Sequence, residues 1–328
     1  MEIPQSSCKE HFAVNESTAK KGRRFSMVKT KKRRSRLNNP YAGYFFIAPQ
    51  LIVFAIFTIY PVFEGFRISL YKTTAVEETF VGLDNYRALF SDPVFIQSIF
   101  NTLFLVVVIT SCTLLFGMIV AVSIFDKGPR YISFIRSCYY LPVIVSTVVM
   151  SMVWKFLLNP ANGLINYLLK QAGSSISNPL GDKNLVLWII AFVTIVASMG
   201  QAILMYVAAM IGVSSDIFEA AEVDGANKLQ RTIHIMLPLV KPTTLYLAVT
   251  NVISILKLFV IIQLLTDGGP NNASMTMMYY LYRNAFIYDK MNVAAAIGVL
   301  MFIIAVIMAL PQFRAMNLTR SKKSKSSK

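Results

Sequence analysis

The apolar residues of this chain gather into six long runs, and this arrangement constrains the fold more than any other feature. Each run is long enough to cross a bilayer core of about 30 Å as a helix. Hydrophobic residues make up 55% of the 328 residues and charged residues only 15%, too little charge for an ordinary soluble domain. We therefore predict an all-α, polytopic membrane protein with six transmembrane helices. The predicted spans cover residues 44–71, 101–125, 134–158, 184–212, 243–266 and 292–313.

Lysine and arginine are concentrated on one side of the predicted spans. Of the 32 basic residues, 17 lie in residues 1–43 and 314–328. With both termini placed inside, the inner segments hold 22 basic residues and the outer segments hold 6. Inner loops of membrane proteins carry the excess of positive charge, so we expect both termini in the cytoplasm. The same distribution accounts for the net charge of +16 and argues against a nucleic-acid partner.

The two ends of the chain differ in composition from the apolar part. Residues 1–43 are polar and rich in Ser, with the run Lys31-Lys32-Arg33-Arg34, and they lack the apolar core of a secretory signal peptide. We predict that 1–43 is a disordered cytoplasmic tail held near anionic lipid by its charge. Residues 44–316 should form the membrane domain, and residues 317–328 a second basic cytoplasmic tail.

The cysteines and histidines form no recognisable site. Cys8, Cys112 and Cys138 match no zinc or redox spacing, and the last two lie in apolar runs where a thiol packs as a small hydrophobic group. His11 and His234 stand alone. We expect no disulfide framework and no metal site.

Two of the predicted outer loops carry signals of folded structure. In residues 72–100, the pairs Asp84-Asn85 and Asp92-Pro93 indicate either a helix start or a turn. Residues 267–291 open with a strong chain-reversal signal, Asp267-Gly268-Gly269-Pro270-Asn271-Asn272. The tyrosines and phenylalanine that follow, from Tyr279 to Phe286, are predicted to lie at the membrane interface.

Residues 214–242 form a polar segment between the fourth and fifth spans. It contains the run Glu219-Ala220-Ala221-Glu222-Val223-Asp224-Gly225-Ala226, followed by Leu237-Pro238 and Pro242. The charge distribution places this segment in the cytoplasm.

The spacing within this segment predicts two short helices. Asp216 can cap the first, with Glu219 as the reciprocal partner three residues later. Gly225 supplies the left-handed residue that commonly ends a helix. A second helix over about 227–236 would stop before Pro238, because the residue before a proline avoids the helical region. The segment is thus predicted to be a helix–Gly–helix elbow, the alternative being a plain amphipathic loop.

This elbow resembles the EAA loop of bacterial ABC-importer permeases, and the chain resembles the maltose/glycerol-phosphate type of carbohydrate permease. The resemblance covers about residues 44–316. Other stretches that carry it are residues 80–86, Asn101-Thr102-Leu103, Leu158-Asn159-Pro160 with Gly163-Leu164-Ile165-Asn166, and Thr266 with Gly268-Gly269-Pro270.

The resemblance implies the fold of a type I ABC importer permease in the bacterial inner membrane. In that family the loop forms coupling helices that seat in a cleft of an ATP-hydrolysing subunit, whose closure rocks the spans between inward-facing and outward-facing states. The implied partners are an ABC ATPase dimer, a second and different permease chain, an extracytoplasmic solute-binding protein and the sugar it delivers. The implied coupling residues are Glu219, Ala220, Ala221, Asp224, Gly225, Leu237 and Pro238.

The chain has no phosphate-binding motif of the G-x-x-x-x-G-K-[ST] kind. We therefore expect that it is not an enzyme and holds no cofactor, with ATP and Mg bound by the separate ATPase. One alternative is a permease for a non-sugar solute such as a glycerol-phosphate-type compound. A secondary transporter is disfavoured because Glu64 is the only acid within the predicted spans. A membrane-embedded enzyme is disfavoured because it would need clustered His, Asp or Ser residues, which this sequence lacks.

Polar residues inside the spans are candidates for the substrate path. The first candidates are Asn251, Lys257 and Gln263 in the fifth span, with Gln201, Asn101 and Tyr206 as further ones. Sugar hydroxyls need donors and acceptors beside apolar surface. The alternative is hydrogen bonding between helices or, for Lys257, snorkelling to the interface. The family often has Asp where this chain has Val260, and an aromatic residue at Gln263, so the resemblance does not name the substrate.

Overall fold

The structure is a computed structural model that describes residues 42–73, 77–173 and 178–325. The chain divides into two compact units, Met1–Phe57 and Thr58–Lys328. In the first unit, the described residues form α1 (Ala42–Phe54) and the start of a π-helical turn, η1 (Ala55–Ile59). The predicted tail 1–43 lies outside the described residues except for its last two positions.

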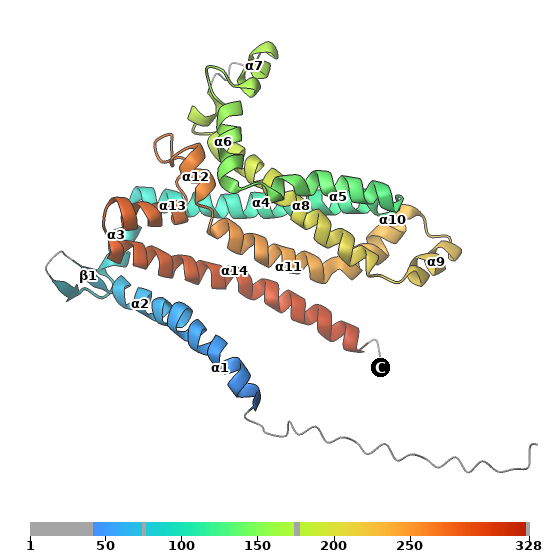
Figure 1. Cartoon of the computed structure of the whole chain (residues 1–328), viewed down its shortest axis with the longest axis horizontal. Helices are drawn as coiled ribbons and strands as arrows, with labels where there is room; N and C mark the ends of the chain where they lie inside the picture. Colours follow the sequence, from blue (N-terminus) through green and yellow to red (C-terminus); the bar gives the residue numbers. More distant parts are fainter. Residues whose placement is uncertain (1–41, 74–76, 174–177, 326–328) are drawn as a thin grey trace, which may run out of the picture. The chain divides into compact units, whose positions relative to one another are not determined.

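Helices make up nearly all of the regular structure in the second unit (Figure 1). The exception among the described residues is a short antiparallel hairpin, in which Tyr71 pairs with Phe80. The all-α prediction is therefore confirmed. The elements before the elbow are α2 (Tyr60–Ser69), β1 (Tyr71–Thr73), β2 (Glu78–Phe80), α3 (Asp84–Phe90), α4 (Pro93–Phe125), α5 (Pro129–Ile144), α6 (Thr147–Leu157), α7 (Leu164–Gln171), η2 (Pro179–Gly181) and α8 (Val186–Ile211). The rest are α9 (Ser215–Val223), α10 (Lys228–Arg231), η3 (Thr232–Met236), α11 (Leu237–Leu256), α12 (Val260–Leu265), α13 (Met277–Tyr282), η4 (Arg283–Ile287) and α14 (Met291–Lys325).

Five helices in the described part are long and apolar enough to cross a membrane, and there are six if the bent pair α5–α6 counts as one span. The five are Tyr44–Ser69, Pro93–Phe125, Val186–Ile211, Lys228–Leu256 and Met291–Gln312. The first, third and fifth of these each begin and end within two residues of the bounds of a predicted span. Pro93–Phe125 begins earlier than predicted, because the Asp92 side chain accepts a hydrogen bond from Val94 N (2.8 Å) and starts the helix there.

The predicted third span, 134–158, is wrong as a single helix. α5 and α6 meet at an angle of 93° across a break of two residues. Val145 and Ser146 are extended, and the Ser146 hydroxyl accepts a hydrogen bond from Val148 N (3.3 Å), so a new helix begins in a new direction. Both halves are apolar, which is why composition alone joined them.

The predicted fifth span, 243–266, is wrong at both ends. The helix runs from Lys228 to Leu256 and passes through Pro238 and Pro242, then breaks before α12. A proline inside a helix lacks the donor for the preceding turn. Here the turn before Pro238 is the wider π turn η3, in which Leu237 N bonds to Thr232 O. The wider turn lets the helix continue past the proline.

The core of the second unit follows α4, α8 and α11, which pack against one another. Leu105 and Ile190 are among its fully buried side chains. α5 lies close to α8 at Gly200, where an added Cβ would be only 2.1 Å from Tyr139 O. Helices in membranes approach closely at such small residues.

Hydrogen bonds fix the segment between α2 and α4. Asn85 Nδ2 donates to Ser69 O (2.8 Å) and Tyr71 O (3.0 Å), and Asn85 Oδ1 accepts from Asn292 Nδ2 at the start of α14 (3.0 Å). This buried network ties the hairpin, α3 and α14 together. Of the two alternatives left open for Asp84-Asn85 and Asp92-Pro93, a helix start is the one found at both places.

Candidate functional site

The elbow predicted at 214–242 is present, and Gly225 forms its turn. Gly225 has a φ of +81°. Ala226 N donates to Ala221 O (2.9 Å) and Gly225 N donates to Glu222 O (3.0 Å), the two bonds of a Schellman helix end. Apart from its two chain neighbours, none of the described residues has an atom within 4 Å of the place where a Cβ would stand. The left-handed backbone, and not crowding, therefore requires glycine here.

The two arms of the elbow begin differently from the prediction. α9 starts at Ser215 with no side-chain cap, so Asp216 lies in its first turn, where the helix dipole still favours a carboxylate. The second arm starts with a reciprocal capping box. Asn227 Oδ1 accepts from Gln230 N (2.8 Å), and Gln230 Oε1 accepts from Asn227 N (2.9 Å). The capping box predicted at Asp216 and Glu219 is therefore wrong, and a different pair, Asn227 and Gln230, forms a capping box at the second arm.

Two ion pairs join parts of the elbow to each other and to α4. Lys228 Nζ lies 2.8 Å from Asp126 Oδ2, which joins the start of α10 to the end of α4. Arg231 Nη1 donates to Glu222 Oε2 (2.8 Å), which joins the second arm to the first. The elbow is therefore fastened both to itself and to a membrane helix other than the two it connects.

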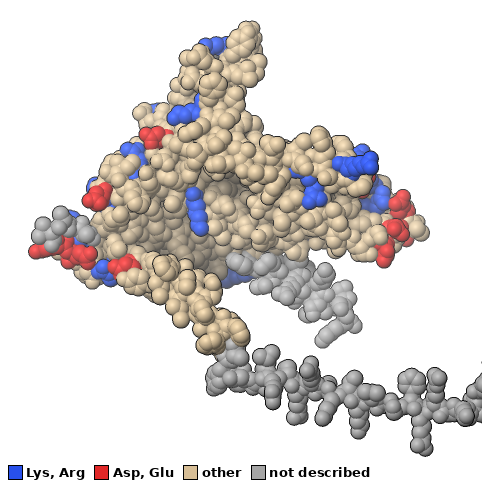
Figure 2. All heavy atoms as spheres, viewed as in Figure 1, with Lys and Arg blue, Asp and Glu red and all other residues tan. Residues whose placement is uncertain are grey.

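A hollow of about 460 Å³ lies between the elbow and the ends of α4 and α8. One wall is apolar and includes Phe125 and Phe218, whose ring centroids are 5.7 Å apart. Figure 2 shows basic and acidic side chains together at the end of the molecule that carries α9 and α10. The charged residues that line the hollow are Asp126, Glu219, Glu222, Lys228 and Arg231.

The residues that the resemblance assigns to coupling lie mostly on the surface of the elbow. Glu219, Ala220, Asp224, Gly225 and Pro238 are exposed, and Ala221 and Leu237 are half-buried. Sequence reasoning missed two apolar residues beside them, Val223 at 89% and Leu229 at 67% exposure. Their apolar character is visible in the sequence, but their exposure depends on the turn at Gly225. An exposed apolar surface rimmed by charge is typical of a protein-binding site.

Polar side chains of α8 and α11 meet in a small cavity of about 40 Å³. The predicted path residue Asn251 lines it, and so does Gln201, but Gln263 lies apart, half-buried on α12. Tyr206, a further candidate, is fully buried among the helices. The polar residues around the cavity are Ser198, Gln201, Thr250, Asn251 and Ser254.

Lys257 does not lie midway along a helix, as the predicted fifth span required. It follows Leu256, the last residue of α11, and the next helix starts only at Val260. Its side chain is exposed. A residue outside both helices stabilises the break, because Thr276 Oγ1 donates to Leu258 O (3.3 Å). Lys257 therefore stands at a helix C-terminus, a position that suits a cation.

Asn101 belongs to the packing of the fold and not to an open path. It is 2% exposed, and its Nδ2 donates to Ala273 O (2.9 Å) and Met275 O (2.8 Å). These bonds draw the segment after α12 against α4. Tyr279 in that segment is 1% exposed, so its side chain packs inside the protein and does not face lipid.

Lys155 is a functional candidate that sequence reasoning missed. It lies on α6, is exposed, and donates from Nζ to Leu264 O near the end of α12 (2.9 Å). α6 and α12 pack against each other. The prediction placed both segments inside unbroken spans, so nothing in the sequence indicated that they meet.

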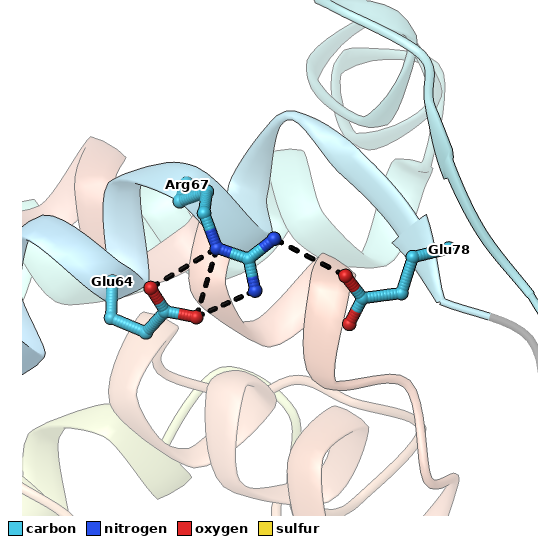
Figure 3. A network of polar contacts seen from close by, with 3 residues as sticks. All are labelled: Glu64, Arg67 and Glu78. Atoms are coloured by element: carbon cyan, nitrogen blue, oxygen red, sulfur yellow. Dashed lines mark hydrogen bonds and ion pairs between the residues drawn. The ribbon is translucent and has the colours of Figure 1, made fainter.

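Figure 3 shows the one acidic residue of the predicted spans, Glu64, in a network of three side chains. Arg67 Nη2 lies 2.6 Å from Glu64 Oε1, and Arg67 Nη1 lies 3.2 Å from Glu78 Oε2. Arg67 thus connects the end of α2 with β2, a structural role. Within the described residues, no group of three or more His, Cys, Asp or Glu could hold a metal ion.

Relatives of known class share most of this chain. Residues 113–315 match the family model described as the binding-protein-dependent transport system inner membrane component. The chain is 34% identical to the probable ABC transporter permease protein YurN of Bacillus subtilis, over 84% of this chain and 96% of that protein. It is 28% identical to the arabinooligosaccharides transport system permease protein AraP of B. subtilis, over 82% and 86% of the two chains. It is 31% identical to the sn-glycerol-3-phosphate transport system permease protein UgpA of Escherichia coli O157:H7, over 83% and 92%.

The fold has a counterpart among solved structures. A chain of a bacterial alginate ABC transporter, crystallised in complex with an alginate pentasaccharide-bound periplasmic protein, matches with a TM-score of 0.74 and 25% identity. The match covers 85% of this chain and 95% of that one. The family match, the identity to YurN and the shared fold agree: the chain is a multi-pass membrane permease that belongs to the family of binding-protein-dependent transport system inner membrane components.

Proposed function

We propose that this chain is the translocating subunit of an ATP-driven importer for a sugar or oligosaccharide. The elbow is the observation that carries the proposal, because it exposes Val223 and Leu229 beside a charged hollow at one end of the membrane helices. The two helical arms joined at Gly225 form a structured surface to which another protein can bind. An ABC ATPase dimer, with its own ATP and Mg, is the partner we assign to that surface.

The geometry supports a coupling mechanism in which movement of the elbow moves the membrane helices. The second arm is part of one helix that runs from Lys228 to Leu256, so it is continuous with α11. The first arm, α9, follows α8 after three residues. Displacement of the elbow would therefore tilt α8 and α11 against α4, as in a rigid-body switch between two states.

The remaining parts of the proposed complex lie in and outside the membrane. A second, different permease chain would pair with this one, and an extracytoplasmic solute-binding protein would deliver the substrate. The distribution of Lys and Arg supports a topology with both termini and the elbow in the cytoplasm of a bacterium.

The named relatives support a sugar as the substrate. AraP is named for arabinooligosaccharides, and the solved transporter was crystallised with alginate on its periplasmic protein. The cavity lined by Asn251 and Gln201 is too small for a sugar, at about 40 Å³, but its polar side chains are of the kind that hydroxyl groups need. The similarity to UgpA supports a second candidate, a glycerol-phosphate-type solute.

Reconstitution tests the proposal. The chain is placed in liposomes with its partner permease, ATPase and solute-binding protein, and ATP-dependent uptake of labelled arabinotriose, maltose and sn-glycerol 3-phosphate is measured. We expect Glu219→Lys and Gly225→Pro to insert normally and hydrolyse ATP while uptake is lost. Lys170→Glu on α7 is the matched control and should transport normally. Normal uptake by both elbow variants would refute the coupling role, and uptake driven by a proton gradient without ATP would refute the importer.

A further inference from the structure

A groove of about 470 Å³ lies between α2, the turn η4 and the first turns of α14. Every residue that lines it is apolar, and five of the fourteen are glycine or alanine. Its floor is buried, with Ala285 and Ala294 each 5% exposed, whereas Phe286 and Met291 at the rim are exposed. Gly65 in the α2 wall has open space where a Cβ would stand. The groove is therefore an apolar hollow that opens to the surroundings of the protein.

One end of the groove coincides with the ends of two membrane spans. The first candidate span ends at Ser69 and the last begins at Met291, and Ile68 and Met291 both line the groove. Buried hydrogen bonds hold these ends together, because Asn85 Nδ2 donates to Ser69 O (2.8 Å) and Asn85 Oδ1 accepts from Asn292 Nδ2 (3.0 Å). Both helices therefore reach the membrane surface at this end, away from α9 and α10 (Figure 1).

The groove is about as long as one leaflet of a bilayer is deep. From Met291 to Phe302, the lining residue furthest along α14, the helix rises about 16 Å at 1.5 Å per residue. A bilayer core of about 30 Å gives each leaflet about 15 Å. At this depth Phe66 of α2 meets Phe302, with ring centroids 6.1 Å apart. A transmembrane helix of another subunit would need a groove along the whole core, whereas a single acyl chain needs only half of it.

The charged groups of the lining elements lie toward the end where the spans stop, and they balance. Residues 291–312 of α14 contain no charged side chain. Arg67 is bonded to Glu64 (2.6 Å) and to Glu78 on the hairpin (3.2 Å), as Figure 3 shows. The charged residues of α2 and η4, those directly before α14, and this partner on the hairpin are Glu64, Arg67, Glu78, Arg283, Asp289 and Lys290. Three are cations and three are carboxylates, so the set complements a zwitterionic group better than one with a net charge.

We propose that the groove binds the acyl chain of a zwitterionic phospholipid of the phosphatidylethanolamine type, in the leaflet away from the elbow. The chain lies along α14 from Met291 toward Phe302, and its phosphate and ammonium groups lie among the charged residues at the ends of the two helices. Burial of its CH₂ groups drives the binding. A lipid in this place contacts the first and the last span at once, so it fills the space between them. The site goes beyond the proposed function, because it does not depend on the solute that is imported.

Photo-crosslinking in membranes tests the site. Membrane vesicles that contain the full chain are loaded with phosphatidylethanolamine that carries a diazirine near the end of one acyl chain, and the labelled residues are identified by mass spectrometry. We expect label on Phe302 at the inner end of the groove. Ile303, an exposed residue of the same turn that does not line the groove, should receive much less.

Filling the groove should displace the lipid. Gly65→Leu places a side chain in open space, so it should fold without a clash. It should lower the label on Phe302 about tenfold, as expected when roughly two CH₂ groups of the lipid lose their burial. Ala295→Leu should do the same from the α14 wall. Gly128→Leu is the matched control, a glycine with equally open space away from the groove, and should leave the label unchanged.

Three results would contradict the proposal. Equal label on Phe302 and Ile303, or label on Phe302 that neither leucine variant lowers, would reveal only the lipid that surrounds any membrane helix. Equal label from a phosphatidylglycerol with the same diazirine would overturn the choice of headgroup. Crosslinking of Phe302 to another subunit instead of to lipid would show that a protein helix fills the groove. These results leave the importer proposal untouched, since that proposal is tested by uptake.

Discussion

Lys228, the first residue of α10, pairs with Asp126, the residue that caps the end of α4, across 2.8 Å. The elbow is joined covalently to α8 and α11, and this ion pair adds α4, a helix that packs on both. Movement of the elbow can therefore reach all three core helices at once.

Reversing either charge of this pair should weaken the coupling of ATP hydrolysis to transport more than it lowers the stability of the fold. Both side chains are about half exposed, so the pair contributes only about 0.2–1 kcal/mol to folding. We expect Lys228→Asp and Asp126→Lys each to lower the amount of substrate imported per ATP hydrolysed, with little change in the melting temperature. The double variant with both charges exchanged should recover coupling. If the exchange fails to rescue either single variant, the pair does not transmit movement.

Gly225 should tolerate asparagine better than alanine. A left-handed backbone costs most L residues about 1–2 kcal/mol, and Asn less. Since the space around the missing Cβ is empty, that backbone cost is the whole expected effect. We expect Gly225→Ala to lower transport and Gly225→Asn to retain more of it. Gly128→Ala, where the glycine has a negative φ and equally open space, is the matched control. Equal activity of the two Gly225 variants would show that the turn conformation does not matter.

The sequence predicts the helices of this fold well where an apolar run is unbroken, and poorly where breaks depend on distant contacts. α8 matches its predicted span because no proline or cap interrupts residues 184–212. The break after Lys257 falls among apolar residues. The hydroxyl that stabilises it, from Thr276, lies 18 positions in sequence from Leu258, whose carbonyl it bonds. No local pattern around Lys257 shows that partner.

In the elbow, the glycine signal predicted the local structure correctly and the proline signal did not. Gly225 has the conformation predicted for it, because a helix end needs only local residues. Pro238 was expected to stop a helix and instead follows the π turn η3, which a propensity argument does not foresee. The surface of the elbow was also only partly predictable, since the exposure of Val223 and Leu229 depends on how the two arms fold back.

Gly200→Ala should disturb the packing of α5 on α8. An added Cβ would stand 2.1 Å from Tyr139 O, and a backbone atom cannot yield as a flexible side chain can. Overpacking of this kind costs about 1–3 kcal/mol. We expect a lower melting temperature in detergent and less protein in the membrane. Gly65→Ala, a glycine of α2 with open space where a Cβ would stand, should have neither effect. A normal melting temperature for Gly200→Ala would mean that the two helices are not held this close.

Asn101 and Asn251 should respond in opposite ways to substitution, although both are polar residues in apolar helices. Asn101→Ala removes the donors to the carbonyls of Ala273 and Met275, of which the second is buried, and an acceptor left unsatisfied in a buried place costs about 1–3 kcal/mol. We expect a lower melting temperature and no change in which solutes are transported. Asn251 is half-buried beside a polar cavity and makes none of the described side-chain hydrogen bonds. Asn251→Ala should therefore leave the melting temperature unchanged while uptake falls. Thermal unfolding in detergent and uptake in liposomes, measured on both variants, check the pair. The same loss of stability in both variants would place Asn251 in the packing of the helices instead of along the path.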